Sequence, residues 1–229
     1  MTTRDCEGLT TRQINQLVRA LVAEGETDIC LRNPGAQHNL LVGLFADARV
    51  SVESSAGYFC AGMIDGPTVM INGNVGWSVA ENMMAGHVTV NGNSGSSTGA
   101  TIRGGTLIVH GNAGARTGIA MKGGTIVVRG NTGYMTGFMM QRGTMIICGD
   151  AGEALGDSMY TGRIFVGGKI AELSNDAVIE PLTEEDRTFL DATLTRANIA
   201  NRYDFKKVVS GRRLWNFSKK EMKLWIQAL

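Results

Sequence analysis

Short runs of aliphatic and β-branched residues recur every 19 positions through the middle of the chain. A corner containing glycine and asparagine follows each run, as in Gly73-Asn74 and Gly92-Asn93. The runs are too short for helices and are bounded by glycine, so they predict strands. A fixed period near 20 residues is typical of a solenoid in which each repeat forms one coil. The chain is therefore predicted to be an all-β solenoid, a right-handed parallel β-helix of about seven coils, with helices at its N-terminal and C-terminal ends.

Alternation within each run places two columns of side chains in the interior of the coil. One column contains Val69, Val88, Leu107, Ile126, Met145 and Ile164, and the other contains Ile71, Val90, Val109, Val128, Ile147 and Val166. A third column contains Ile64, Met83, Ile102, Met121, Met140 and Met159. Because methionine adapts to irregular gaps, this third column predicts core packing and not a cofactor site.

A column between the two interior ones should face outward, yet it is apolar over much of its length. Its members are Met70, Thr89, Ile108, Val127, Ile146 and Phe165. Strands that are apolar on both faces are usually covered on both faces. We therefore expect either the terminal helices of this chain or another protein to cover it. On this ground Ile108, Val127, Ile146 and Phe165 are candidate interface residues.

Two corners of the coil have their own repeating residues. The first predicts a structural ladder, in which equivalent side-chain amides hydrogen-bond up and down coils stacked about 4.8 Å apart. The ladder residues are Asn74, Asn93, Asn112, Asn131 and Asp150. The second corner needs a positive φ or a close approach of two backbones. Its glycines are Gly86, Gly105, Gly124, Gly143 and Gly162.

The N-terminal segment, residues 1–34, is predicted to form a helical cap and a strand. A helix is expected over residues 10–24, where Thr10 and Gln13 form a capping box. A short strand follows at residues 28–31 and ends at a turn. The β-helix is assigned to residues 35–172, with an atypical first coil.

The C-terminal segment, residues 173–229, is predicted to be a helical and extended tail. Its helix begins at Thr183, and acidic residues occupy the first turn. Further on, aromatic and basic residues are mixed, a composition that is typical of interfaces. Arg212, Arg213, Trp215 and Phe217 are candidate interface residues for this reason, and packing against the flank of the solenoid is the equal alternative.

Composition excludes several classes of function. The net charge is +1 and there is no run of lysine and arginine, which argues against nucleic-acid binding. No apolar run approaches the roughly 18 residues of a membrane span, and the N-terminus does not resemble a signal peptide. The four cysteines form no CxxC pair, so we expect reduced thiols and a cytoplasmic protein.

No catalytic, cofactor-binding or metal-binding residue is indicated. The histidines are His38, His87 and His110, and the last two lie in different columns, so stacking does not form a three-histidine metal site. The glycine-rich corners lack the GxxxxGK[ST] pattern of a phosphate-binding loop. No pair of carboxylates has the spacing of a general acid and base.

The corner at residues 111–118 and the strand that follows it resemble the GXGXG β-helix family. That family includes the C-terminal domain of the glutamate synthase large chain and the β-helix chain of formylmethanofuran dehydrogenase. Segments at residues 80–84, 156–160 and 204–217 are most similar to the β-helix chain of the N-methylglutamate synthases, which extends the resemblance over nearly the whole chain.

The resemblance implies a non-catalytic scaffold subunit in a hetero-oligomer that converts methylamine and glutamate to N-methylglutamate and ammonia. It implies two partners, a class II glutamine amidotransferase-like subunit and an FMN-binding glutamate synthase-like subunit. FMN and an iron–sulfur cluster are expected in a partner, and no cofactor on this chain. Two alternatives stay open. One is the β-helix subunit of a formylmethanofuran dehydrogenase or formyltransferase/hydrolase-type complex, and the other is a stand-alone β-helix enzyme.

Overall fold

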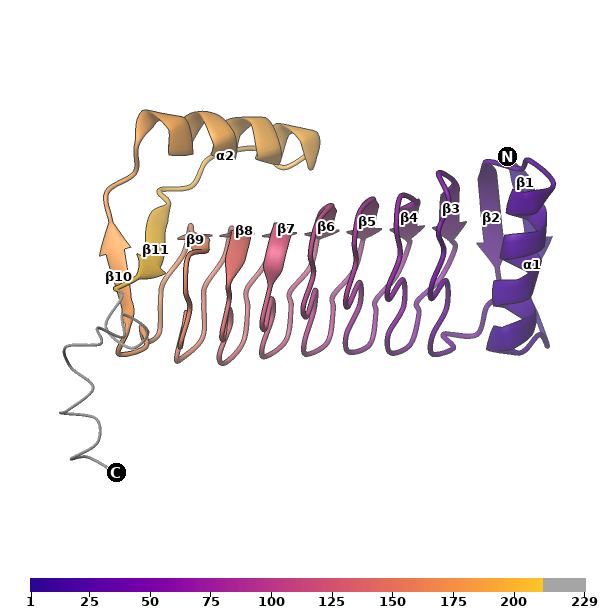
Figure 1. The fold of residues 1–229 in the computed structure, drawn as a ribbon, viewed down its shortest axis with the longest axis horizontal. Helices are drawn as coiled ribbons and strands as arrows, with labels where there is room; N and C mark the ends of the chain where they lie inside the picture. The colour runs from indigo at the N-terminus through magenta and orange to yellow at the C-terminus, as the bar shows by residue number, and fades with distance from the viewer. Residues whose placement is uncertain (212–229) are drawn as a thin grey trace, which may run out of the picture.

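A computed structural model describes residues 1–211 of the chain. They form a parallel β-solenoid of about seven turns, with two helices, as the 19-residue period predicts. Figure 1 shows the coils stacked in one row, with α1 (Thr11–Ala23) closing the N-terminal end and α2 (Glu184–Arg196) lying beside the last coils. No helix within residues 1–211 is long and apolar enough to cross a membrane.

One wall of the solenoid is an 11-stranded sheet in the order β1-β2-β3-β4-β5-β6-β7-β8-β9-β11-β10. The strands are β1 Thr2–Asp5, β2 Asp28–Arg32, β3 Arg49–Val52, β4 Thr68–Ile71, β5 His87–Val90, β6 Thr106–Val109, β7 Lys122–Val128, β8 Arg142–Ile147, β9 Arg163–Val166, β10 Ala177–Glu180 and β11 Lys206–Ser210. From β1 to β9 all neighbours are parallel, whereas β11 is antiparallel to both β9 and β10. Between β3 and β9 the paired residues are 19 apart, so equivalent side chains stack directly; the exception is the pair Lys122 and Arg142, which are 20 apart at an irregularity at the start of β7 and β8.

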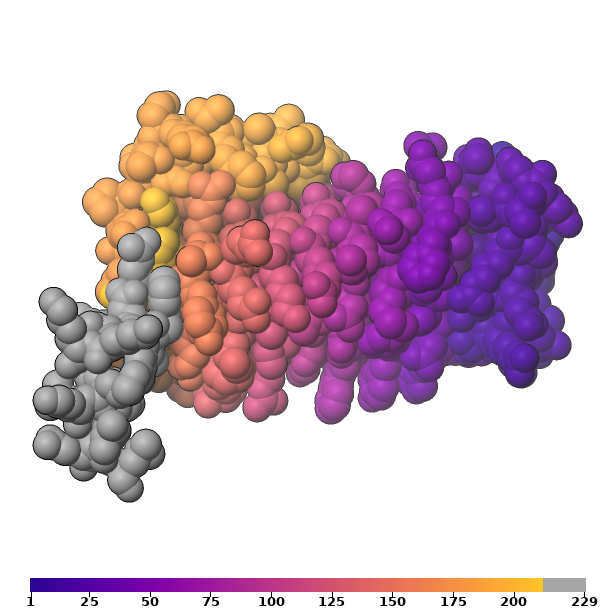
Figure 2. Space-filling model, viewed as in Figure 1, coloured from indigo at the N-terminus to yellow at the C-terminus, as the bar shows by residue number. Residues whose placement is uncertain are grey.

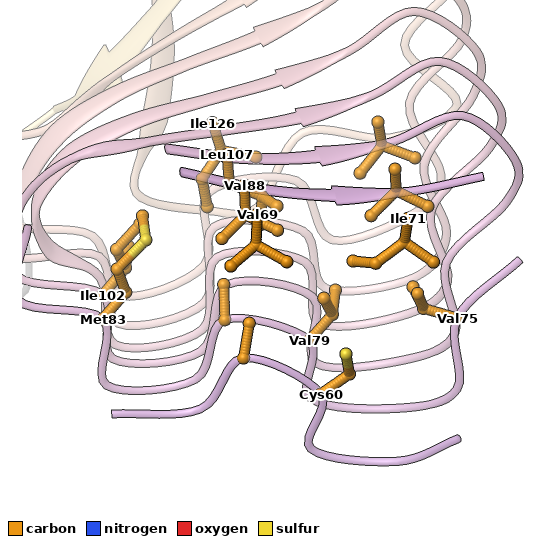
Figure 3. Packing of buried hydrophobic residues seen from close by; sticks show 14 of the residues in the cluster. Cys60, Val69, Ile71, Val75, Val79, Met83, Val88, Ile102, Leu107 and Ile126 are labelled. Atoms are coloured by element: carbon orange, nitrogen blue, oxygen red, sulfur yellow. The ribbon is translucent and has the colours of Figure 1, made fainter. Parts of the chain in front are cut away.

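The interior of the coils contains the three predicted columns. Figure 3 shows Val69, Val88, Leu107 and Ile126 lying in a row inside the coil. Every member of the two strand columns and of the methionine-rich column is completely buried. The methionine-rich column therefore packs the core, as predicted. A line of single parallel bridges, Ala56, Val75, Ser94, Ala113, Thr132, Ala151 and Ile170, runs along another wall.

The asparagine corner is a ladder of a different kind from the predicted one. The side-chain Oδ1 of Asn93 accepts a hydrogen bond of 2.8 Å from the backbone N–H of Asn112, and Asn112 does the same for Asn131. The bonds thus run from backbone to side chain and do not join one amide to the next. Only an acceptor is needed at each position, which explains why Asp150 can replace asparagine and bind the N–H of Lys169.

The glycines at the second corner are needed for backbone conformation in all but one case. Gly86, Gly105, Gly124 and Gly143 have φ of +105°, +75°, +74° and +100°, values that favour glycine. Gly162 has no such φ. A Cβ there would lie 2.6 Å from the sulfur of Met140, so close packing explains this glycine.

The N-terminal helix closes the end of the core. The side chain of Thr10 accepts from the backbone of Gln13, and the Gln13 side chain accepts in return, so the predicted capping box is present. Ile14, Val18 and Leu21 are buried in the same cluster as the interior columns. This helix therefore covers apolar side chains that the first coil would otherwise leave in water.

The C-terminal segment contains the predicted helix and two strands that the sequence pattern did not predict. Thr183 caps α2 through a capping box with Asp186, while β10 and β11 extend the sheet beyond β9. The candidate interface residues Arg212, Arg213, Trp215 and Phe217 lie outside the described residues.

Candidate functional site

The outer face of the sheet is the surface on which the sequence placed its candidate interface. The term outer face denotes the side of strands β3 to β9 that points away from the interior of the coils. The outer face has two columns of stacked side chains. The first column contains Arg49, Thr68, His87, Thr106, Thr125, Thr144 and Arg163. The second column contains Ser51, Met70, Thr89, Ile108, Val127, Ile146 and Phe165. The second column is mixed from Ser51 to Thr89 and wholly apolar from Ile108 to Phe165, so the two halves of the outer face differ in chemistry.

Helix α2 covers the apolar half of the outer face. Val127, Ile146 and Phe165 are completely buried in a cluster with Leu190 and Leu194 of the helix. Figure 2 shows the helix lying over the C-terminal coils and ending before the N-terminal ones. The terminal helix of the same chain is therefore the cover. As a correction, these three residues are not available to a partner, and Ile108 at the margin is only partly exposed.

An ion-pair cluster holds α2 onto the sheet. Asp186 in the first turn of the helix contacts Arg163 of β9 at 3.0 Å and Lys207 of β11 at 3.1 Å. Lys207 also contacts the more exposed Glu180 of β10 at 3.5 Å. Since the Asp186 side chain is only 3% exposed, its charge depends on these two cations for compensation.

The guanidinium of Arg163 adds contacts with aromatic rings. It lies 4.7 Å from the ring centre of Phe189 on α2 and 5.5 Å from that of Phe165 on β9. Cation–π contacts of this kind contribute about 0.5–1 kcal/mol at partly exposed sites. One side chain therefore joins the helix to the strand through both charge and ring stacking.

The ion pairs of Asp186 should make the free energy of unfolding depend on pH. Burial raises the pKa of Asp186, but hydrogen bonds from Thr183 and Lys207 outweigh it and hold the pKa below 3.8, its ordinary value. A lowered folded-state pKa gives stability that is present above the unfolded pKa and is lost as the pH falls through the folded one. Asp186→Asn should therefore cost about 2 kcal/mol at pH 7, where it leaves Arg163 without a counter-charge and Lys207 with Glu180 alone.

Urea unfolding of both proteins at pH 7 and at pH 3 measures this difference. The difference in the free energy of unfolding between the wild type and Asp186→Asn should be smaller at pH 3 than at pH 7. Glu184→Gln is the control, because Glu184 is 90% exposed and its pair with Arg187 is 3.9 Å long. An equal difference in the free energy of unfolding at both pH values would show that the charge of Asp186 does not hold α2 on the sheet.

A pocket of about 290 Å³ lies where the C-terminal end of α2 meets the sheet. Its lining residues are His87, Thr106, Ile108, Thr125 and Val127 from β5 to β7, and Phe189, Thr193, Arg196 and Ala197 from the helix and its end. The floor is apolar and the rim carries hydroxyls and two basic side chains. Sequence reasoning missed this pocket, because it forms between segments that are roughly 60 to 110 positions apart.

An exposed aromatic stack lies on the N-terminal coils, and sequence reasoning missed it as well. The rings of His38 and Tyr58 are stacked with centres 4.4 Å apart, and those of Tyr58 and Trp77 with centres 5.5 Å apart. Tyr58 is 49% exposed and Trp77 is 58% exposed. The spacing of 19 residues between Tyr58 and Trp77 was the signal that could have revealed this aromatic stack.

The histidine, cysteine and carboxylate side chains of residues 1–211 do not form a cluster that could bind a metal ion. Within residues 1–211, no group of three or more histidine, cysteine, aspartate or glutamate side chains could hold a metal ion. The four cysteines are buried and unpaired. Burial raises the pKa of Cys60 to about 12 and that of Cys148 to about 11, so both thiols stay protonated at neutral pH. Burial, together with the charge of Arg129, lowers the pKa of His110.

Comparison with known proteins finds similarity in sequence and in fold. No family model matches the chain. Over 70 residues the chain is 41% identical to Protein GlxC of Rhizobium meliloti (strain 1021), and this stretch covers 29% of the chain and 31% of GlxC. The alignment thus spans about a third of that relative.

The solved structure is the formyltransferase/hydrolase complex (FhcABCD) from Methylorubrum extorquens, determined by X-ray crystallography in complex with methylofuran. One of its chains matches with a TM-score of 0.51 and 25% identity, over 66% of this chain and 68% of that one. The chain is therefore a parallel β-solenoid, similar in fold to a chain of FhcABCD and similar in sequence, over one stretch, to GlxC.

Proposed function

We propose that this chain is a scaffold subunit of a multisubunit enzyme and holds no active site of its own. The exposed aromatic stack of His38, Tyr58 and Trp77 is the observation that carries this proposal. Large aromatic side chains are enriched in the centres of protein interfaces, and exposed patches of them mark interaction sites. The similarity to a chain of FhcABCD supports it, since that protein is itself a complex.

Among multisubunit enzymes, the N-methylglutamate synthases are the proposed type. The resemblance at residues 80–84, 156–160 and 204–217 supports this assignment. The partners are then a class II glutamine amidotransferase-like subunit and an FMN-binding glutamate synthase-like subunit that carries FMN and an iron–sulfur cluster. The reaction of the whole assembly is the formation of N-methylglutamate and ammonia from methylamine and glutamate.

A second candidate is a β-helix subunit of a formyltransferase/hydrolase-type complex. The fold similarity to FhcABCD is the observation that favours it. The two candidates differ in their partners: the first requires an amidotransferase and a flavin enzyme, and the second requires a formyltransferase and a hydrolase.

Purification of the tagged full chain from its native cells, with identification of the proteins that remain bound, tests the assignment. We expect the amidotransferase-like and FMN-binding subunits, and N-methylglutamate formation only when all three subunits are mixed. Trp77→Ala should weaken assembly while the fold stays intact, because the ring is mostly in water. Turnover by this chain alone, or co-purification of a formyltransferase, would overturn the first candidate.

A further inference from the structure

The wall of the coils that carries the aromatic stack has large and small side chains in one column. The term turn wall denotes residues 57–65 together with the equivalent residues of the coils that follow. Backbone hydrogen bonds join each coil of this wall to the next, as from the N–H of Ser78 to the carbonyl of Ser96 at 2.9 Å. The outward column of the turn wall, in consecutive coils, is Tyr58, Trp77, Ser96, Ala115 and Tyr134.

The aromatic stack ends at Trp77. Its rings lean over the coil that follows, since a Cβ at Gly76 would lie 2.3 Å from Cδ1 of Tyr58 and a Cβ at Gly95 would lie 2.4 Å from Cδ1 of Trp77. The next two members of the column, Ser96 and Ala115, carry no ring. A ring-free stretch of two coils, about 10 Å long, therefore lies directly beside Trp77.

Charged side chains divide the turn wall at the same place. Positions 82–149 contain no aspartate or glutamate. The acidic residues Asp65 and Glu81 lie on the coils of the aromatic stack, whereas Arg103 and Lys122 lie on the two coils that follow. Within residues 1–211 none of these four side chains takes part in an ion pair. One half of the turn wall is thus aromatic and acidic, and the other half is small and basic.

A two-fold axis can bring the two unlike halves together. The coils are stacked in one row, so two copies can lie side by side in opposite directions (Figure 1). If the axis passes between the coils of Trp77 and Ser96, every column of one copy faces the same column of the other in reverse order. The pairs across the axis are then Trp77 with Ser96, Tyr58 with Ala115, and Asp65 with Lys122.

We propose that the turn wall is the interface of a homodimer, in which the aromatic stack of each copy occupies the ring-free stretch of the other. Aromatic side chains in a closely packed centre and opposite charges across the contact are the features that stabilise interfaces. The same patch is used on both copies, so the assembly closes after two. The dimer goes beyond the proposed scaffold role and does not rest on it, because partner subunits take no part in the pairing.

Sedimentation velocity of the purified full chain over a range of concentrations tests the dimer. We expect a species with twice the chain mass of 24.4 kDa. Trp77→Ala should weaken dimerisation at least about thirtyfold, as is usual for a central aromatic residue. Ser96→Trp should be monomeric, because its ring occupies the stretch that the second copy needs. Met70→Ala is the control, since Met70 is exposed on the outer face, and it should dimerise as the wild type does.

Exchange of charges separates the interface from an effect on folding. Asp65→Lys and Lys122→Asp each place like charges opposite one another, so each variant alone should dimerise about tenfold more weakly. An equimolar mixture of the two variants should recover the affinity of the wild type, because every pair across the axis is then of opposite sign. Damage to the fold of either variant would not be repaired by mixing.

Three results would each overturn the proposal: a wild-type chain that stays monomeric, a dimer that survives Ser96→Trp, or a mixture that dimerises as weakly as its components. A monomeric chain that still binds the amidotransferase-like subunit would overturn the dimer and leave the proposed function standing.

Discussion

Replacing Gly130 with alanine is expected to lower the free energy of unfolding by roughly 3 kcal/mol. A Cβ at this position would lie 2.3 Å from Oδ1 of Asn112 and 2.7 Å from the backbone oxygen of Gly111. Both distances are far below a van der Waals contact. The coil can avoid the clash only by moving away from its neighbour, and this movement breaks the hydrogen bond from the Asn131 N–H to Asn112.

Urea unfolding followed by circular dichroism measures the loss. Gly25→Ala is the control: its φ is +91°, but nothing lies within 4 Å of its added Cβ. The control should therefore show only the conformational cost of about 1–2 kcal/mol. If Gly130→Ala cost no more than the control, close stacking of the coils would not be the reason for glycine at the ladder corner.

Ile146→Asp is expected to cost roughly 4 kcal/mol and to release α2 from the sheet, since it places a charge without a partner among apolar groups. Ile146 is completely buried beneath Leu190, Leu194 and their neighbours. Hydrogen exchange of the α2 amides, together with urea unfolding, measures the two effects.

Met70→Asp is the matched control for this prediction. Met70 belongs to the same column of the outer face, four coils earlier, and is 42% exposed. Its substitution should change stability by less than about 0.5 kcal/mol, as is usual at exposed positions. Equal losses in the two variants would mean that α2 does not protect the outer face in solution.

The repeat predicted the sheet well because each coil contacts only its neighbours. A period of 19 residues sets the register directly, so the pairing of Val69 with Val88 and of Val88 with Leu107 follows from the sequence alone. The capping boxes at Thr10 and Thr183 were equally predictable, because they depend on residues three positions apart.

Strands outside the repeat could not be predicted in the same way. β1 is Thr-Thr-Arg-Asp and lacks alternating apolar residues, since it is a polar strand at the margin of the sheet. β11 contains Lys206 and Lys207, which belong to the mixed aromatic and basic stretch that the sequence pattern placed in the C-terminal tail. Lys207 is accommodated in the strand because it pairs with Asp186, and that contact is visible only in three dimensions.

For the candidate interface, the sequence pattern predicted that a cover is needed but not which segment supplies it. The pattern showed that Val127, Ile146 and Phe165 need a cover, but it did not decide between this chain and another. Helix α2 is the cover because the ion pairs of Asp186 with Arg163 and Lys207 hold it on the sheet, and the helix belongs to a segment beyond the repeat. The pocket was missed because its two sides come from segments far apart in the chain, whereas the 19-residue spacing of Tyr58 and Trp77 could have revealed the aromatic stack.

The reversal of strand direction at β11 has a consequence for the behaviour of the molecule at high concentration. A stack of identical parallel coils is a template onto which the first coil of another copy could add, giving a growing fibre. Here β11 and β10 place antiparallel strands over the last coil, and α1 closes the core at the other end. The two ends of the solenoid therefore present different strand directions, so we expect head-to-tail addition of a second copy to be disfavoured.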